Sequence, residues 1–176
     1  VLAEVADVVP FFKGITRERL GKFGLQWPVK EDGTDTKILH EKEFKLGKGR
    51  LKYFDWKESA EIRENKKEYP LILTTSRVLQ HYNAATMTRR TSNIDLCNED
   101  ILLVHPKDAK YRELNTGDIA RLYSGRGEVA LKVEVSDKVK EGVVFTTFHF
   151  PEHMVNMVTG HGKDEETKCA EYKISS

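Results

Sequence analysis

The stretch 128–135 alternates strictly between polar or small residues and apolar residues. Val129, Leu131, Val133 and Val135 occupy one set of alternate positions, and charged residues or alanine occupy the other. Alternation with a period of two places the two sets on opposite faces of a β-strand. The pattern therefore predicts a half-buried strand and favours a sheet-based fold for the surrounding chain.

Short apolar runs bounded by turn residues predict further strands around this one. A hairpin turn at 124–127 joins the alternating strand to the one before it, and this interpretation of Gly125-Arg126-Gly127 is favoured over the start of a dinucleotide fingerprint. The additional predicted strands are 70–73, 101–104, 119–123, 143–150 and 170–174.

Two helices are predicted between these strands. Pro106 stands where the first turn of a helix accepts proline, so a helix is expected from 106 to about 114. Pro151 predicts a second helix, and its apolar face would comprise Met154, Val155 and Val158. Many short strands with inserted helices predict a mainly β fold, either a small β-barrel or a mixed sheet, and not a repeated βαβ unit.

The first third of the chain is less regular. Residues 2–9 have the spacing of a helix, Thr16 is expected to cap a short helix, and 51–56 is predicted as a strand. The charge-dense stretch 57–67 is interpreted as a linker or a solvated helix. We therefore predict a preceding segment over 1–66 and a folded domain over 67–176.

The balance of charge limits the classes of partner. The sequence carries 29 basic and 28 acidic side chains and has a net charge of +1, whereas a nucleic-acid-binding protein would show a basic excess. No stretch reaches the roughly 18 apolar residues that a membrane span needs. We therefore expect no nucleic-acid partner and no direct membrane insertion.

Two candidate metal or redox features have ordinary alternatives. Cys97 and Cys169 lack metal-ligand spacing, and they can form one disulfide or remain two buried thiols. The run 149–153 matches the H-x-x-E-H spacing of one zinc-protease class, but only His161 is near enough in sequence to act as a third imidazole ligand. A helix start with partly buried histidines is favoured there. Since no nucleophile motif is present either, the sequence indicates a binding or scaffolding piece.

The strongest candidate for ligand binding is the stretch 74–83. It follows a predicted buried strand, and its hydroxyls and loop amides can donate hydrogen bonds to phosphate oxygens. Arg77 can clamp a phosphate in bidentate fashion, and His81 and Asn83 add polar groups. The pattern predicts a phosphate or nucleotide site, and the alternative is a polar turn with a surface arginine.

The same stretch begins a series of motifs that continues along the chain. The motifs are Tyr69-Pro70-Leu71, 74–79, His81-Tyr82, 86–90, 104–109, 116–118, 124–129, 142–145, Asn156 and 171–173. In this order they resemble the molybdopterin-dinucleotide-binding domain, the C-terminal domain of the large subunit of molybdenum and tungsten oxidoreductases. Gly14-Ile15, 24–28, Leu39-His40 and 47–50 resemble the segment that precedes this domain in formate dehydrogenases.

The resemblance implies a double-psi β-barrel that covers the nucleotide end of a bis(molybdopterin guanine dinucleotide) cofactor with Mo or W. It places Arg77, His81 and Asn83 against the phosphates and guanosine. It also implies that Thr75 and Ser76 hold the approach of that loop and that Phe148 lies against the cofactor. Asn156, Tyr172 and Lys173 would return to the same site from the last helix and strand.

The resemblance further implies that the whole enzyme oxidises formate to CO2 and passes the electrons to an iron–sulfur cluster. The metal ligand, the catalytic residues and the cluster cysteines would lie upstream, so no catalytic residue is expected in this chain. Implied partners are the upstream domains of the same subunit and an electron-transfer subunit. A bacterial source is expected. A periplasmic location is slightly favoured over a cytoplasmic one, by analogy with exported formate dehydrogenases.

Two alternatives remain open on the sequence. Periplasmic nitrate reductases share the run 86–90, although Gln26-Trp27-Pro28 and Phe148-His149-Phe150 favour formate dehydrogenase. The other alternative, from a different class, is a cofactor-free β-barrel interaction module.

Overall fold

The structure is a computed structural model that describes residues 1–44, 46–53, 55, 58–164, 168–170 and 174–175. It divides into two compact units, Val1–Asp55 and Trp56–Ser176. No helix among the described residues is long and apolar enough to cross a membrane.

The first unit holds three short helices, α1 (Leu2–Val8), η1 (Pro10–Phe12) and α2 (Arg17–Leu20). The predicted cap is confirmed, because the Thr16 hydroxyl accepts a hydrogen bond from the backbone N–H of Arg19. The Arg19 guanidinium donates to the carbonyls of Gly14 and Gly33, and these contacts fasten the loops that follow. Trp27 packs edge-on against Phe11.

The prediction of a strand at 51–56 is wrong over the described part of that stretch. Residues 51–53 and 55 form no regular secondary structure, and 54 and 56 lie outside the described residues. Leu51 and Tyr53 are almost completely exposed. The alternation is present in this stretch, but the described residues place no neighbouring strand beside it.

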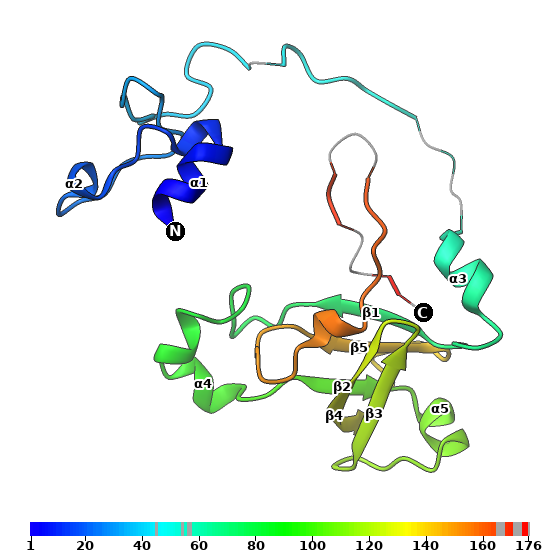
Figure 1. The fold of residues 1–176 in the computed structure, drawn as a ribbon. Helices are drawn as coiled ribbons and strands as arrows, with labels where there is room; N and C mark the ends of the chain where they lie inside the picture. The colour runs from blue at the N-terminus through cyan, green and yellow to red at the C-terminus, as the bar shows by residue number, and fades with distance from the viewer. Residues whose placement is uncertain (45, 54, 56–57, 165–167, 171–173, 176) are drawn as a thin grey trace. The chain divides into compact units, whose positions relative to one another are not determined.

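The second unit is built on one mixed sheet of five strands (Figure 1). Its order is β1-β5-β2-β4-β3. The pairs β1–β5 and β2–β4 are parallel, and the pairs β2–β5 and β3–β4 are antiparallel. The strands are β1 (Ile72–Ser76), β2 (Ile101–Val104), β3 (Ile119–Ser124), β4 (Gly127–Val135) and β5 (Val143–Thr147).

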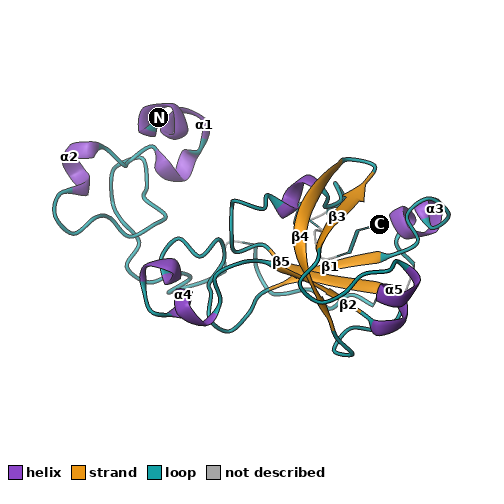
Figure 2. Ribbon diagram, turned by 90° about the horizontal axis from the view of Figure 1, so that it is seen from below, coloured by secondary structure: helices purple, strands orange, loops and turns teal. Residues whose placement is uncertain are grey.

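The sheet is curled, since β3 and β4 cross the other three strands at a steep angle (Figure 2). Its buried side chains form one core, which includes Leu73, Leu102, Leu131 and Val144. The alternating strand behaves as predicted, because Val129, Leu131 and Val133 are buried while the residues between them are exposed. The prediction of a mainly β fold is confirmed.

Short helices connect and flank the strands: α3 (Ala60–Asn65), η2 (Thr88–Arg90), α4 (Asn93–Leu96), α5 (Pro106–Tyr111) and η3 (Val155–Met157). Pro106 opens α5 as predicted. The stretch interpreted as a linker or solvated helix contains α3, which buries Ile62. Glu61 of α3 forms an ion pair of 2.7 Å with Arg126 in the turn between β3 and β4.

Two predicted strand boundaries are corrected. The strand predicted at 70–73 runs over Ile72–Ser76, so the hydroxyl residues Thr74 to Ser76 belong to β1 and not to the loop. The strand predicted at 143–150 ends at Thr147.

The helix predicted from Pro151 is a turn followed by the single 3-10 turn η3, because Met154 adopts a left-handed backbone (φ 47°). Val155 and Val158 are nevertheless buried. Of the strand predicted at 170–174, residues 171–173 lie outside the described residues. Ala170 forms an isolated bridge to Lys163, and Ser175 forms one to Leu73.

Candidate functional site

The candidate site lies where β1 and β5 end. The two strands are parallel and in register, with Ser76 opposite Thr147. One step beyond this pair, Arg77 lies beside Phe148, and two steps beyond it, Val78 lies beside His149. The parallel pairing therefore places the predicted ligand loop, residues 77–84, next to the run Phe148-His149-Phe150.

Arg77 is held in a fixed geometry on the surface of this loop. Its Nε and Nη2 atoms donate to Oδ1 of Asn83 over 3.1 Å and 2.8 Å. Its guanidinium also lies 5.3 Å from the centre of the Phe148 ring. A guanidinium held by an amide oxygen and an aromatic face keeps further N–H donors for a ligand.

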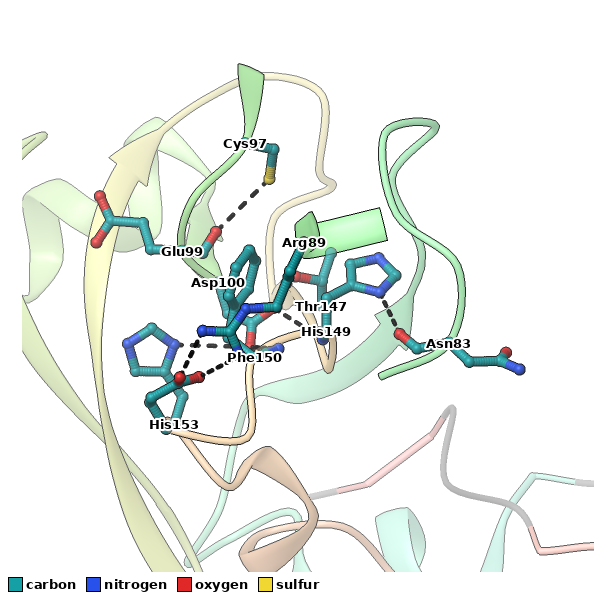
Figure 3. A network of polar contacts seen from close by, with 10 residues as sticks. Asn83, Arg89, Cys97, Glu99, Asp100, Thr147, His149, Phe150 and His153 are labelled. Atoms are coloured by element: carbon teal, nitrogen blue, oxygen red, sulfur yellow. Dashed lines mark hydrogen bonds and ion pairs between the residues drawn. The ribbon is translucent and has the colours of Figure 1, made fainter. Parts of the chain in front are cut away.

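His149 is completely buried beneath the same loop. Its Nε2 atom accepts a hydrogen bond of 3.0 Å from the backbone N–H of Val78. Its Nδ1 atom lies 2.5 Å from the carbonyl oxygen of Asn83, and Figure 3 shows this contact. A carbonyl can only accept, so Nδ1 carries the proton and the imidazole is the neutral Nδ1–H tautomer.

His81 is also buried, and both of its ring nitrogens have partners within the chain. Its Nε2–H donates to the carbonyl of Cys97 over 2.7 Å, and Nδ1 lies 2.8 Å from the hydroxyl of Thr88. Its ring packs edge-on against Phe150. Its predicted contact with a ligand stays a prediction, and the observed contacts connect the loop to the segment that follows it.

A buried carboxylate organises the run after β5 (Figure 3). Asp100 has no exposed surface, and it lies just before β2. Its Oδ1 atom accepts from the hydroxyl of Thr147 and from the backbone N–H of His149, and its Oδ2 atom accepts from the backbone N–H of Phe150. Three donors from one short segment thus converge on one carboxylate.

A second arginine, Arg89, packs against Phe150 in the same group of residues. Arg89 forms two hydrogen bonds with the Glu152 carboxylate, and its guanidinium lies 5.2 Å from the centre of the Phe150 ring. The hydrogen bonds from Arg89 hold the pKa of Glu152 below its ordinary value, so this ion pair forms at neutral pH and weakens as the pH falls below the ordinary range of glutamate.

The loop also carries backbone donors without a partner among the described residues. The N–H groups of Leu79, Gln80, Asn83 and Ala84 meet no acceptor there, whereas those of Val78, His81 and Tyr82 do. Such N–H groups close to a fixed guanidinium are the donor set that phosphate oxygens require. The residues present therefore fit a phosphate-bearing group.

The structure brings together Arg77, His81, Asn83 and Phe148 of the predicted site residues. Thr75 is buried within the sheet, and Ser76 is the last residue of β1. Asn156 is exposed on η3, which adjoins the start of β4, and no hydrogen bond joins it to Arg77 or Asn83 in the described part of the chain. Tyr172 and Lys173 lie outside the described residues. Ligand contacts for all these residues stay predictions.

Sequence reasoning missed His149 and Asp100 as parts of this site. The sequence presents His149 as a possible metal ligand, as a partly buried histidine or as part of the motif 148–150, but not as a support for the loop, and no pattern singles out Asp100. Within the described ranges no group of three or more His, Cys, Asp or Glu side chains is arranged to hold a metal. Cys97 and Cys169 form no disulfide, and burial raises the pKa of the Cys97 thiol. The sequence predicts two partly buried histidines in place of a zinc site. His153 is partly buried, whereas His149 is completely buried.

The fold and the site thus define a β-sheet domain with a loop at the ends of two parallel strands whose donors fit an anion. Residues 71–176 match the family described as the molydopterin dinucleotide binding domain. The chain belongs to this family.

The chain is also similar to curated proteins from methanogens. It is 39% identical over 178 residues to the F420-dependent formate dehydrogenase subunit alpha of Methanocaldococcus jannaschii, covering 99% of this chain and 26% of the relative. It is equally identical, over the same length, to the F420-dependent formate dehydrogenase 2 subunit alpha of Methanococcus maripaludis. The chain spans about a quarter of the length of these relatives.

Among solved structures, the fold is similar to acetylene hydratase from Pelobacter acetylenicus. The TM-score is 0.58 at 22% sequence identity, and the match covers 88% of this chain and 24% of that protein. At this identity the likeness concerns the fold alone.

Proposed function

We propose that this chain holds the guanine-dinucleotide end of a bis(molybdopterin guanine dinucleotide) cofactor in a formate dehydrogenase large subunit. Membership in the dinucleotide-binding family supports the class of cofactor, and the similarity to formate dehydrogenase alpha subunits supports the enzyme. The observation that carries the proposal is the fixed guanidinium of Arg77 beside loop N–H groups that have no acceptor in the described part of the chain.

Within this proposal each residue has a separate task. Arg77 offsets phosphate charge, and Phe148 supports the guanidinium from below. The N–H groups of Leu79, Gln80, Asn83 and Ala84 donate to phosphate and guanosine oxygens. The bound cofactor supplies the oxidation–reduction chemistry through its Mo or W centre. The five-stranded curled sheet supports a double-psi β-barrel as the complete architecture.

GDP is the simplest probe of the proposed site, because it carries the guanosine and phosphates of the cofactor. We expect amide chemical shifts of the 176-residue chain to move with GDP at 76–84 and 148–150, and to leave α5 and the β3–β4 turn unchanged. No shift at millimolar GDP would contradict a preformed nucleotide site and favour the cofactor-free module. Adenosine diphosphate serves as the control for guanine recognition.

For the whole protein, we propose oxidation of formate to CO2, with electrons passing to an iron–sulfur cluster outside this chain and then to an electron-transfer subunit. We expect the full-length protein to reduce an artificial electron acceptor with formate and to show no nitrate reduction with a reduced dye. Nitrate reduction without formate oxidation would contradict this proposal and support the nitrate reductase alternative. Protein stripped of its cofactor is the control.

A further inference from the structure

We propose that His149 is a positioning residue: its buried imidazole holds both ends of the loop 78–83 so that Arg77 and the loop N–H groups face the ligand. This inference rests on the proposed function and deepens it. His149 has no exposed surface, so it acts through the loop and not by touching the ligand.

The imidazole joins two backbone groups that are close in sequence to each other but far from His149. The Val78 N–H is 71 positions away from His149 and the Asn83 carbonyl is 66 positions away. One nitrogen accepts and the other donates, so both contacts need the same neutral tautomer. Both hydrogen bonds are partly buried, so a backbone N–H or carbonyl that loses its partner there carries a free-energy cost, and this cost favours the closed loop.

These two contacts fix the two backbone positions on which the placement of the Arg77 guanidinium depends. Val78 directly follows Arg77, so its N–H fixes the backbone at the base of the arginine side chain. Asn83 supplies both the carbonyl that His149 binds and the Oδ1 atom that Arg77 binds. The Asn83 backbone is left-handed (φ 48°), a conformation that asparagine adopts more readily than most residues, and the hydrogen bond to His149 helps to hold it there. One ring therefore sets the positions of both the arginine and its amide partner.

His149 is itself fixed from several sides. Its backbone N–H donates to Asp100, and its ring lies 5.5 Å from the His81 ring and 5.6 Å from the Phe148 ring, centre to centre. The ring therefore cannot turn without disturbing the cluster. Such support from buried contacts is what holds a binding group in a productive geometry.

Three substitutions separate the two contacts. In His149→Asn the side-chain amide can occupy the Nδ1 position and keep the bond to the Asn83 carbonyl. In His149→Gln the amide oxygen can reach the Nε2 position and keep the bond from Val78. His149→Phe fills the site but makes neither bond. Val133→Ala, in the buried part of β4, is the control for destabilisation without a change at the loop.

The measurement is the amount of guanine nucleotide that each subunit of the full-length protein still retains after dilution and gel filtration. We expect His149→Phe to retain about tenfold less nucleotide than the unsubstituted protein, with His149→Asn and His149→Gln between the two. Val133→Ala is expected to retain the normal amount, although it lowers the melting temperature. Retention that followed melting temperature across all four variants would show a merely structural role and overturn the proposal.

Arg77→Ala distinguishes failure of this inference from failure of the proposed function. If Arg77→Ala loses nucleotide while His149→Phe retains it, the positioning role is wrong and the proposed function stands. If the unsubstituted protein contains no guanine nucleotide, the proposed function fails and the inference fails with it.

Discussion

Replacing Asp100 by alanine is expected to lower the free energy of unfolding of the sheet-containing unit by roughly 3–5 kcal/mol. The reason is that three donors lose their acceptor at once: the Thr147 hydroxyl and the backbone N–H groups of His149 and Phe150. The site is completely buried, so water does not easily replace the carboxylate. Urea denaturation monitored by circular dichroism measures the change.

The matched control for Asp100 is Asp137→Ala, because Asp137 is exposed after β4 and takes part in no ion pair among the described residues. This control is expected to change stability by less than about 0.5 kcal/mol. Asp100→Asn keeps the volume and one acceptor oxygen but presents an NH2 group in place of the other oxygen, so an intermediate loss is expected. A loss for Asp100→Ala as small as that for Asp137→Ala would contradict the role given to the carboxylate.

Replacing Arg77 by alanine is expected to weaken guanine-nucleotide binding by about 10- to 100-fold, which is the range for one hydrogen bond to a charged group. The two hydrogen bonds to Asn83 and the contact with the Phe148 ring hold the guanidinium in one position, so little ordering is needed when a phosphate binds. Arg77→Lys keeps the charge but loses the planar fork, and we expect it to recover only part of the affinity. The dissociation constant for GDP and the nucleotide content of the full-length protein both report the effect.

Arg121→Ala is the matched control for Arg77. Arg121 is likewise exposed, lies 5.2 Å from an aromatic ring centre and pairs with an acceptor side chain, Glu128, but it lies on β3 away from the loop. Nucleotide binding is expected to be unchanged in this variant. Equal losses for Arg77→Ala and Arg121→Ala would mean that overall charge, and not the placed guanidinium, attracts the nucleotide.

The local features of this protein follow from its sequence because they depend on neighbouring residues. The alternation at 128–135 identifies β4, Thr16 and Pro106 mark two helix starts, and the short apolar runs locate β1 and β2. The series of motifs from 69 onward also indicates the family that residues 71–176 match. The donors Arg77 and Asn83 are identifiable because their side chains have few other uses on an exposed loop.

Local pattern fails where the backbone or a distant partner decides the outcome. Val155 and Val158 are buried as their spacing predicts, yet no α-helix forms, because Met154 adopts a left-handed conformation that an α-helix cannot include. At 51–55 the alternation is present, but a strand needs hydrogen bonds from a neighbour, and the described residues offer none there.

The sequence by itself determined which side chains of this protein can donate to an anion and in which segments the five strands of the sheet lie. Only the tertiary structure decided how they meet, because the parallel register of β1 and β5 is set by contacts about 70 positions apart. That register places His149 under the loop and Phe148 under Arg77. Asp100, 50 positions from Phe150, likewise gains its role only when β2 packs beside β5. Non-local pairing leaves no periodic signal in the chain, so the site's donors are visible in the sequence and their support is not.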